Sequence, residues 1–400
     1  MGILIKDILA ILPDESRKCD IYLENQRISA IDSEPEGFIC QRTIDGSDCL
    51  ITPGLVNAHT HVYMTGFRNQ ADDLDFNTWL FDRIMPMEDA LTPEEAYKWT
   101  VAGCREMLSH GVTSFLDMHM FPSCTPRAAI ETGIRAVISR GLSGGAGDKS
   151  GGERRIREAI AEIEEYSGTP NLSFMLAPHA PYTCSEAYLR EIAAIAAELG
   201  LGIHTHLCES KGEVGGIFKE YGCTPIELFD RCGLLSDKTV AAHCVHITEA
   251  DINILAGRGV SVASNPASNL KLANGIAPVS ELLKHGVNVC LGTDSAASNN
   301  SLSILRELQL VTLLSKGISG DTTQVTAREG FLMATRNGAK ALGLEGCGEI
   351  RVGATADLAI FNIDIPSMQP LGDPVAALAY SSAGLNAEIT IVGGKIVYEK

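Results

Sequence analysis

Residues 49–62, CLITPGLVNAHTHV, are the first of a series of apolar runs that alternate with helical segments. This apolar run ends in His59-Thr60-His61, where the alternation of a β-strand places both imidazoles on the same side. Seven further apolar runs follow, and segments with helical periodicity lie between them. Eight alternating strand and helix units predict an α/β fold, a closed (β/α)8 barrel of the TIM type. The predicted strands are Cys49–Val62, Val112–Met118, Arg135–Leu142, Ser173–His179, Gly202–Glu209, Thr239–Cys244, Gly259–Pro266 and Asn288–Asp294.

The main competing fold is a doubly wound open sheet. That fold more often carries a glycine-rich dinucleotide loop after its first strand, and ITPGLVNAHTH is no such loop. The connection from Tyr63 to Leu91, between the first strand and its helix, is long for a βα loop. Because long loops often form active-site lids, we expect this segment to cover the site.

Both ends of the chain have the pattern of short strands and turns, as in CDIYLENQRISAID, ADLAIFNID and AEITIVGGKIVYE. Each end alone is too small to form a stable sheet. We therefore expect residues 1–55 and 346–400 to join in one small β-sandwich-like domain, which leaves residues 56–345 for the catalytic barrel.

Composition and charge exclude several classes of protein. With 400 residues, of which 45% are hydrophobic, the chain can bury a large core and is not intrinsically disordered. A net charge of -18 repels nucleic acids and anionic membranes. The first residues contain neither a membrane span nor a signal-peptide pattern, and the 12 cysteines include no CxxC pair. A cytoplasmic protein with reduced thiols is expected.

Polar residues at the carboxyl ends of the predicted strands indicate a metal site, because these ends face the active site of a barrel. The predicted ligands are His59, His61, His206 and Asp294. His204 points to the same side as His206, which we favour because it is nearest the strand end. Three imidazoles and one carboxylate suit Zn²⁺ first, with Fe²⁺ and Mn²⁺ as alternatives.

One metal ion is expected rather than a bridged pair. Two-metal barrel hydrolases commonly use a lysine of the fourth strand as the bridge. Here no lysine occurs between Lys149 and Lys211, and the fourth strand ends in Pro178-His179.

The same residues suggest a reaction. A divalent metal ion lowers the pKa of a bound water from about 16 towards about 7, and Asp294 can accept the proton as hydroxide adds. His243 can stabilise the charge on that oxygen. Glu209, three residues after His206, is placed to protonate a ring nitrogen of the substrate. This pattern predicts hydrolytic deamination of a heteroaromatic amine.

The chain resembles the amidohydrolase superfamily and, within it, the methylthioadenosine/S-adenosylhomocysteine deaminases. The resemblance spans the chain and is carried, in order, by PGLVNAHTH, WLFDRIMPMEDALT, APHAPYTCS, HTHLCES, AAHCVH, SNPASNLKLANGIAPV and LGTDSAASNNSL.

The resemblance implies the same metal ligands and the same proton-transfer residues, Glu209, His243 and Asp294. It also implies that Glu88 contacts the ribose hydroxyls, that His179 contacts the nucleoside, and that Arg140 lies near the 5′ side. The substrate would be a purine nucleoside from the salvage of S-adenosylmethionine by-products. The family further suggests a homo-oligomer, with a tetramer as one option.

This sequence departs from the family's pattern at one position that bears on the 5′ substituent of the substrate. A second arginine of the family directly follows a Gly-Gly pair, whereas this chain reads Gly151-Gly152-Glu153-Arg154-Arg155. The 5′ contact is therefore open among Arg140, Arg154 and Arg155. Methylthio, homocysteinyl, hydroxyl and plain hydrogen all stay open as substituents, since the family includes 5′-deoxyadenosine deaminases.

Two other hypotheses compete with an adenosine-type deaminase. The first is an amidohydrolase that acts on another heterocycle, such as guanine, cytosine or an s-triazine. A ribose-binding Glu88 would have no purpose there. The second is a catalytically inactive metal-binding scaffold, against which the presence of Glu209 argues, because Glu209 is not needed to hold the metal.

Overall fold

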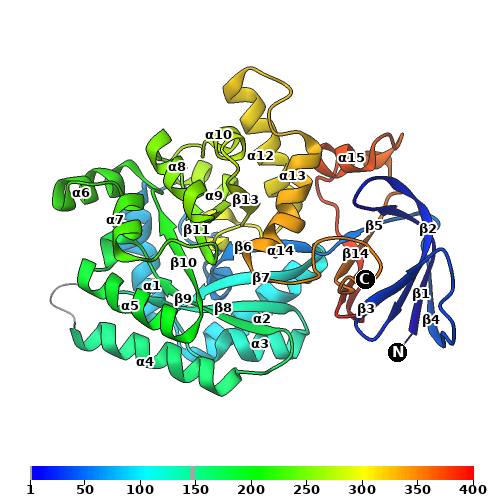
Figure 1. Cartoon of the computed structure of the whole chain (residues 1–400), viewed down its shortest axis with the longest axis horizontal. Coiled ribbons are helices and arrows are strands. Elements are labelled where there is room, and N and C mark those ends of the chain that lie inside the picture. The colour runs from blue at the N-terminus through cyan, green and yellow to red at the C-terminus, as the bar shows by residue number, and fades with distance from the viewer. Residues whose placement is uncertain (1, 145–148) are drawn as a thin grey trace.

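The computed structural model of the chain describes residues 2–144 and 149–400 and contains two eight-stranded sheets (Figure 1). The larger unit is the predicted barrel. Its strands follow one another around the sheet in chain order, and each pairs in parallel with its neighbour. They are β6 (Leu55–Thr60), β7 (Val112–His119), β8 (Arg135–Leu142), β9 (Leu172–Pro178), β10 (Gly202–Leu207), β11 (Thr239–His243), β12 (Ser261–Ser264) and β13 (Asn288–Leu291).

Hydrogen bonds near the ends of β13 and β6 bring the two edges of the barrel together. The Asp294 amide donates to the His59 carbonyl at 3.0 Å, and the Asn57 side chain accepts from the Thr293 amide at 3.0 Å. The prediction of a (β/α)8 barrel is confirmed.

The first predicted strand, Cys49–Val62, is wrong as a single element. It consists of β5 (Cys49–Pro53), which belongs to the smaller sheet, and β6 of the barrel. The chain changes sheet at Gly54, where an added Cβ would lie 2.0 Å from Thr113 Oγ1. Such a close approach requires glycine, and a run of apolar residues carries no mark of the change of sheet.

The interior of the barrel is packed at one end and polar at the other. Helix α14 (Arg336–Ala341) packs against an apolar cluster inside the strands. The cluster contains Val56, Ala58, Leu116, Val137, Met175, Val240, Ala263 and Cys290. The carboxyl ends of the strands are left for the functional groups, as in other barrels of this type.

Helices surround the barrel (Figure 1). Helix α5 (Glu186–Leu199) illustrates why they form where they do: Ser185 Oγ accepts from the Tyr188 amide, and Gly200 ends the helix with a φ of 68°. The other helices that cover the strands are α2 (Pro93–Ser109), α3 (Cys124–Thr132), α4 (Lys149–Tyr166), α6 (Lys211–Tyr221), α7 (Pro225–Cys232), α8 (Glu249–Arg258), α10 (Val279–Lys284), α12 (Ile304–Ser319) and α13 (Ala327–Ala334). Among the described helices, none is long and apolar enough to cross a membrane.

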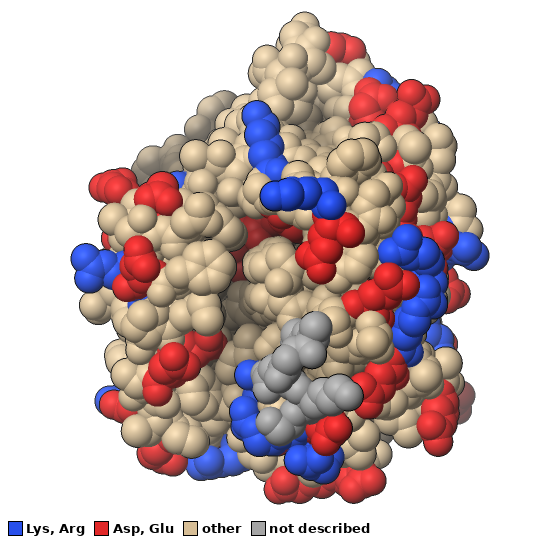
Figure 2. All heavy atoms as spheres, turned by 90° about the vertical axis from the view of Figure 1, so that its left-hand side faces the viewer, with Lys and Arg blue, Asp and Glu red and all other residues tan. Residues whose placement is uncertain are grey.

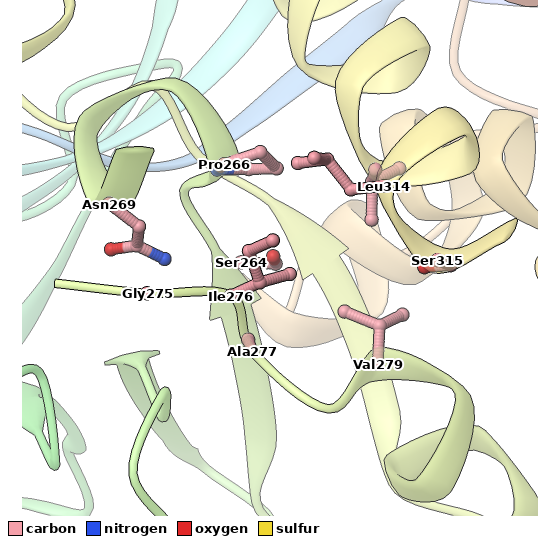
Figure 3. A pocket seen from close by; sticks show the side chains of 10 residues that line it. Ser264, Pro266, Asn269, Gly275, Ile276, Ala277, Val279, Leu314 and Ser315 are labelled. Carbon is pink, nitrogen blue, oxygen red and sulfur yellow. The ribbon is translucent and has the colours of Figure 1, made fainter. Parts of the chain in front are cut away.

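Two short helices follow the seventh and eighth strands directly. They are α9 (Pro266–Lys271) after β12 and α11 (Ala296–Asn299) after β13. A small pocket lies beside α9, and Asn269 and Gly275 line it together with Leu314 and Ser315 of α12 (Figure 3).

The connection after β6 folds back over the barrel. It contains a 3-10 turn (Val62–Phe67), a π-helical turn (Thr78–Ile84) and α1 (Met85–Ala90). Tyr63, Phe67 and Trp79 anchor it in an apolar cluster. Figure 2 shows the face on the left of Figure 1, with a central recess that has acidic side chains at depth.

The smaller sheet is built from both ends of the chain, as predicted. Its order is β16-β15-β14-β5-β1-β2-β3, and β4 pairs with β1. Its strands are β1 (Gly2–Ile11), β2 (Ser16–Glu24), β3 (Arg27–Ile31), β4 (Cys40–Asp45), β5, β14 (Leu358–Asn362), β15 (Ala387–Val392) and β16 (Lys395–Glu399). The sheet has its own apolar core, and α15 (Pro374–Tyr380) connects it to α12 through a bond from Gln309 to the Tyr380 carbonyl. The domain boundaries 1–55, 56–345 and 346–400 stay a prediction.

Candidate metal and catalytic site

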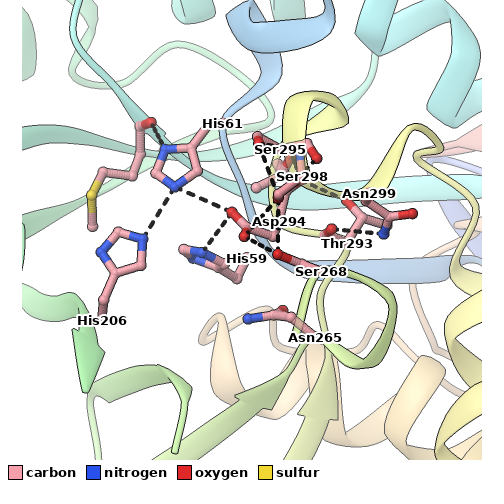
Figure 4. A network of polar contacts seen from close by, with 12 residues as sticks. His59, His61, His206, Asn265, Ser268, Thr293, Asp294, Ser295, Ser298 and Asn299 are labelled. Atoms are coloured by element: carbon pink, nitrogen blue, oxygen red, sulfur yellow. Dashed lines mark hydrogen bonds and ion pairs between the residues drawn. The ribbon is translucent and has the colours of Figure 1, made fainter. Parts of the chain in front are cut away.

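Four side chains from three strand ends meet inside the mouth of the barrel (Figure 4). His59 lies on β6, His61 directly follows this strand, His206 lies on β10, and Asp294 follows β13. One ligand atom of each lies within 4.8 Å of the others, and all four residues are buried. These are the four residues that the sequence predicts as metal ligands, and His204 is not among them.

Hydrogen bonds fix the direction of two of these imidazoles. His61 Nδ1 lies 2.7 Å from the Met118 carbonyl, and His206 Nδ1 lies 2.7 Å from the His179 carbonyl. Because a carbonyl oxygen only accepts, both Nδ1 atoms carry the proton, and each neutral ring has its lone pair on Nε2. These two Nε2 atoms face each other at 3.1 Å. Two lone pairs at this distance are the arrangement that a cation between them would satisfy.

His59 completes the set of nitrogen donors. Its Nε2 has no hydrogen-bond partner among the described residues and lies 3.5 Å from Asp294 Oδ1. Burial lowers the pKa of His59 to about 4, so the ring is neutral at neutral pH. A buried nitrogen with an unused lone pair is costly unless something binds it. Three such nitrogens and one carboxylate fit the donor set of Zn²⁺ and related divalent ions.

Two serine hydroxyls hold Asp294. Ser268 Oγ and Ser298 Oγ donate to Asp294 Oδ2 at 2.6 and 3.0 Å, while Oδ1 lies 3.5 Å from the Nε2 atoms of His59 and His61. Burial alone would raise the pKa of Asp294, but its interactions with His59 and neighbouring histidines hold the pKa well below its usual range. The carboxylate is therefore ionised and presents one free oxygen to the site (Figure 4).

Glu209 and His243 lie beside this group. Glu209 Oε2 is 3.9 Å from His243 Nε2, and burial raises the pKa of Glu209. For His243, burial alone would lower the pKa, but the carboxylates of Glu209 and Asp294 shift it upward overall.

Sequence reasoning missed the two asparagines that orient this pair. Asn269 Oδ1 accepts from His243 Nδ1 at 2.8 Å, and Asn274 Nδ2 donates to Glu209 Oε1 at 3.0 Å. Both asparagines are buried. Their only signal in the sequence is the stretch SNPASNLKLANGIAPV, which carried the family resemblance without a role for any of its residues.

Glu213 is a second missed residue. Its two carboxylate oxygens accept from the backbone amides of Cys208 and Glu209 at 2.7 and 2.8 Å. Glu213 thus anchors the loop from which Glu209 projects. Burial raises the pKa of Glu213 to about 7, with a further contribution from Glu209.

The long first connection brings Glu88 to Tyr63. The Tyr63 hydroxyl donates to Glu88 Oε1, and burial raises the pKa of Glu88. Tyr63 is fully buried, so this bond ties α1 to the segment directly after His61. His179, which follows β9, has its ring centroid 4.8 Å from that of His206. Burial lowers the pKa of His179 to about 3.

The three arginines near the predicted 5′ side differ in their surroundings. The Arg140 side chain is 5% exposed and pairs with Glu158 at 3.0 Å. The Arg154 side chain is 55% exposed and pairs with the same carboxylate at 2.6 Å. Arg155 Nη1 donates to the Ser143 carbonyl at 2.9 Å. Arg140 is therefore the buried one of the two that share Glu158.

Comparison with known proteins identifies the family of the chain. The amidohydrolase family matches residues 50–397. A 5-methylthioadenosine/S-adenosylhomocysteine deaminase of Moorella thermoacetica is 44% identical and covers 91% of this chain and 85% of its own length. A 5′-deoxyadenosine deaminase of Methanothermobacter thermautotrophicus is 41% identical and covers 95% of this chain and 89% of its own length.

Among solved structures, an adenosine deaminase from Xanthomonas campestris with bound zinc superposes with a TM-score of 0.93 at 32% identity. The match covers 98% of this chain and 92% of that chain. The predicted resemblance is confirmed: the chain belongs to the amidohydrolase family, among the methylthioadenosine/S-adenosylhomocysteine and 5′-deoxyadenosine deaminases.

Proposed function

We propose that the protein is a hydrolytic deaminase of 5′-modified adenosines, which replaces the 6-amino group by an oxo group and releases ammonia. The observation that carries the proposal is the meeting of His59, His61, His206 and Asp294 around one point, with Glu209 and His243 beside them. The relatives named as deaminases, at 41% and 44% identity, support the same reaction.

His59, His61, His206 and Asp294 would hold one divalent ion, with Zn²⁺ as the first candidate and Fe²⁺ or Mn²⁺ as alternatives. Once bound, such an ion supplies hydroxide at neutral pH by lowering the pKa of water towards about 7.

The protein's own groups would handle the protons. Asp294, ionised and with Oδ1 free, accepts the proton released as water adds to C6 of the purine. His243 stabilises the charge that develops on the added oxygen. Glu209, whose pKa is raised by burial, gives its proton to the adjacent ring nitrogen. The exocyclic amine then takes the proton held by Asp294 and leaves as ammonia, while the proton of the added hydroxyl returns to Glu209 as the C6 oxo group forms. The overall change is nucleoside plus water to the inosine analogue plus ammonia.

Glu88 and His179 would recognise the nucleoside. Tyr63 holds the Glu88 carboxylate in a fixed position, from which it can accept bonds from the ribose hydroxyls. Thr183 Oγ1 donates to the Ala180 carbonyl at 3.1 Å and so accepts from His179 Nδ1 at 3.1 Å, which leaves His179 Nε2 as an acceptor. Arg140 is the arginine we assign to the 5′ side, because its guanidinium is buried whereas that of Arg154 is half exposed.

A cytoplasmic homo-oligomer, with a tetramer as one option, is part of the same proposal. The substrates named by the relatives suggest salvage of S-adenosylmethionine by-products. Size-exclusion chromatography with light scattering tests the assembly.

The test of the reaction is ammonia release by the zinc-loaded protein from six substrates, compared by kcat/KM: 5′-deoxyadenosine, methylthioadenosine, S-adenosylhomocysteine, adenosine, guanine and cytosine. We expect the adenosines to be preferred, and their order names the 5′ substituent. Activity on free bases alone would favour the amidohydrolase alternative with another heterocycle. A zinc-loaded protein inert to all six would favour an inactive scaffold.

A further inference from the structure

We infer that His204 is a positioning residue for His59. Its Nε2 accepts a hydrogen bond from His59 Nδ1 and so keeps the lone pair of His59 Nε2 directed at the metal position. The inference rests on the proposed metal site but not on the identity of the substrate. His204 sits two residues before His206 on β10, on the same side of the strand. Its ring faces His59 rather than the group of four ligand atoms.

The contacts form one continuous chain through the interior of the barrel. His59 Nδ1 lies 2.7 Å from His204 Nε2, and His204 Nδ1 lies 2.9 Å from Ser139 Oγ. Ser139 Oγ in turn lies 2.7 Å from the backbone carbonyl of Asp117 on β7. At most 1% of each of these four residues is exposed, so the chain is closed to solvent.

The last member of the chain determines the direction of every bond. The Asp117 carbonyl can only accept, so the Ser139 hydroxyl donates to it. Ser139 Oγ then accepts from His204 Nδ1, which leaves His204 Nε2 without a proton. His204 Nε2 must therefore accept from His59 Nδ1. The neutral His59 ring keeps its lone pair on Nε2, 3.5 Å from Asp294 Oδ1.

His59 needs this partner because none of the described backbone carbonyls accepts from its Nδ1. His61 and His206 donate directly to the carbonyls of Met118 and His179, whereas His59 is packed between other imidazoles, with ring centroids 5.1 Å from His61 and 4.8 Å from His206. Without an acceptor at His204, the proton of His59 would be left unpaired or would move to Nε2, where it would block the ion. Partners of this kind are worth roughly 10- to 100-fold in metal affinity.

The experiment measures Zn²⁺ affinity by competition with a chromophoric chelator, in the wild-type protein and in four variants. His204→Phe keeps the ring volume but removes both nitrogens, and we expect a 10- to 100-fold loss of affinity. His204→Gln places an amide oxygen near the position of Nε2, and we expect it to recover most of the loss. Ser139→Ala removes the end of the chain, and we expect a smaller loss than for His204→Phe.

Ser114→Ala is the matched control. Ser114 is a buried strand serine on β7 whose Oγ has no hydrogen-bond partner among the described residues, so its loss should leave Zn²⁺ affinity unchanged. The visible spectrum of the Co²⁺-loaded protein gives a second readout. It should change in His204→Phe and return towards the wild-type spectrum in His204→Gln, which a purely structural defect would not produce.

Equal Zn²⁺ affinity and equal Co²⁺ spectra in wild type, His204→Phe and Ser139→Ala would overturn the inference. So would a loss that His204→Gln leaves unrepaired although circular dichroism shows that it folds. If His204→Phe does not fold, Ser139→Ala and His204→Gln decide between the outcomes. A wild-type protein that does not bind Zn²⁺ would instead contradict the proposed metal site itself.

Discussion

Two residues at the centre of the site have a positive backbone φ. Asp294 has a φ of 57° and His243 a φ of 71°, in the left-handed region that non-glycine residues rarely adopt. Strain of this kind costs about 1–3 kcal/mol per residue and persists only where surrounding bonds hold it. For Asp294 these are the hydrogen bonds that its carboxylate accepts from the two serine hydroxyls and the hydrogen bond that its backbone amide donates to the His59 carbonyl.

Glu209 gives the most direct test of the acid–base assignment. Glu209→Gln keeps the size of the side chain but cannot give up a proton as a carboxylic acid does, so we expect kcat to fall about 10²- to 10⁴-fold. Zinc content should not change, because Glu209 is outside the group of four ligands. Steady-state ammonia release and metal analysis of the same preparation check both statements. Wild-type turnover in the variant would remove Glu209 from the mechanism.

Glu88 tests whether the substrate carries a ribose. We expect Glu88→Ala to lower kcat/KM for the adenosines about 10- to 100-fold, since the site loses a charge-assisted bond to the sugar hydroxyls. Asp89→Ala is the matched control, because Asp89 is the adjacent carboxylate and is exposed. If Glu88→Ala and Asp89→Ala both turned over nucleosides like the wild type, Glu88 would not be a ribose contact.

At the residue scale, spacing predicts the groups that could bind metal but not those that orient them. HxH on one strand is a local pattern, and so are residues that directly follow strands. Asn274 and Glu209 are 65 positions apart in sequence, and Ser139 and His204 are also 65 positions apart. Nothing local in the sequence marks such pairs, because only barrel closure brings them together.

At the scale of elements, the segment that starts with α9 supports three different strand ends. Ser268 holds Asp294 after β13, Asn269 holds His243 at the end of β11, and Asn274 holds Glu209 after β10. The shortness of β12, which ends at Ser264, allows this segment to turn back across the mouth of the barrel. The predicted strand Gly259–Pro266 was too long, because the observed strand is Ser261–Ser264.

Asn274 provides a prediction for pH dependence. Its bond to Glu209 stabilises the ionised carboxylate and so lowers the pKa of Glu209 against the larger effect of burial, which raises it. Asn274→Ala therefore raises the pKa of Glu209 further. The acid form then persists to higher pH, and the alkaline limb of the kcat profile should move to higher pH. A profile measured on wild type and variant in the same buffers checks the direction, and an unchanged limb or a shift to lower pH would contradict it.

Glu307 on α12 links three elements and makes stability depend on pH. It accepts from the Ala267 amide and from Asn299 Nδ2, both at 2.9 Å, and burial raises its pKa from 4.5 to about 7. Its contribution to the free energy of unfolding is thus complete below pH 4.5 and is lost as the pH rises through about 7. The shift corresponds to up to about 3 kcal/mol.

Urea denaturation of wild type and Glu307→Gln at about pH 5 and about pH 8 tests this contribution. We expect the wild type to lose more stability than the variant over this interval, because glutamine has no proton to release. Equal pH dependence in the two proteins would show that Glu307 has the same pKa in the folded and unfolded chain.

For the whole molecule, the alternation of strands and helices was sufficient to predict the barrel. Each βα unit is formed by residues that are consecutive in the chain, so its apolar pattern can be recognised locally. The change of sheet at Gly54 was not predictable. Residues 50–53 and 55–60 are all buried, but β5 pairs with β14, more than 300 positions away in sequence. The same pairing of β5 with β14 joins the first and last parts of the chain in one sheet.

We propose that the protein deaminates a nucleoside at the 6-position with one divalent ion. The most direct test is incubation of the protein, loaded with a single equivalent of Zn²⁺, with 5′-deoxyadenosine, with the purine product identified by mass spectrometry and ammonia measured in parallel. We predict 5′-deoxyinosine and one ammonia per molecule converted, with activity lost on chelation and restored by one equivalent of Zn²⁺. Intact 5′-deoxyadenosine, methylthioadenosine and adenosine after prolonged incubation with the loaded protein would contradict the proposed reaction.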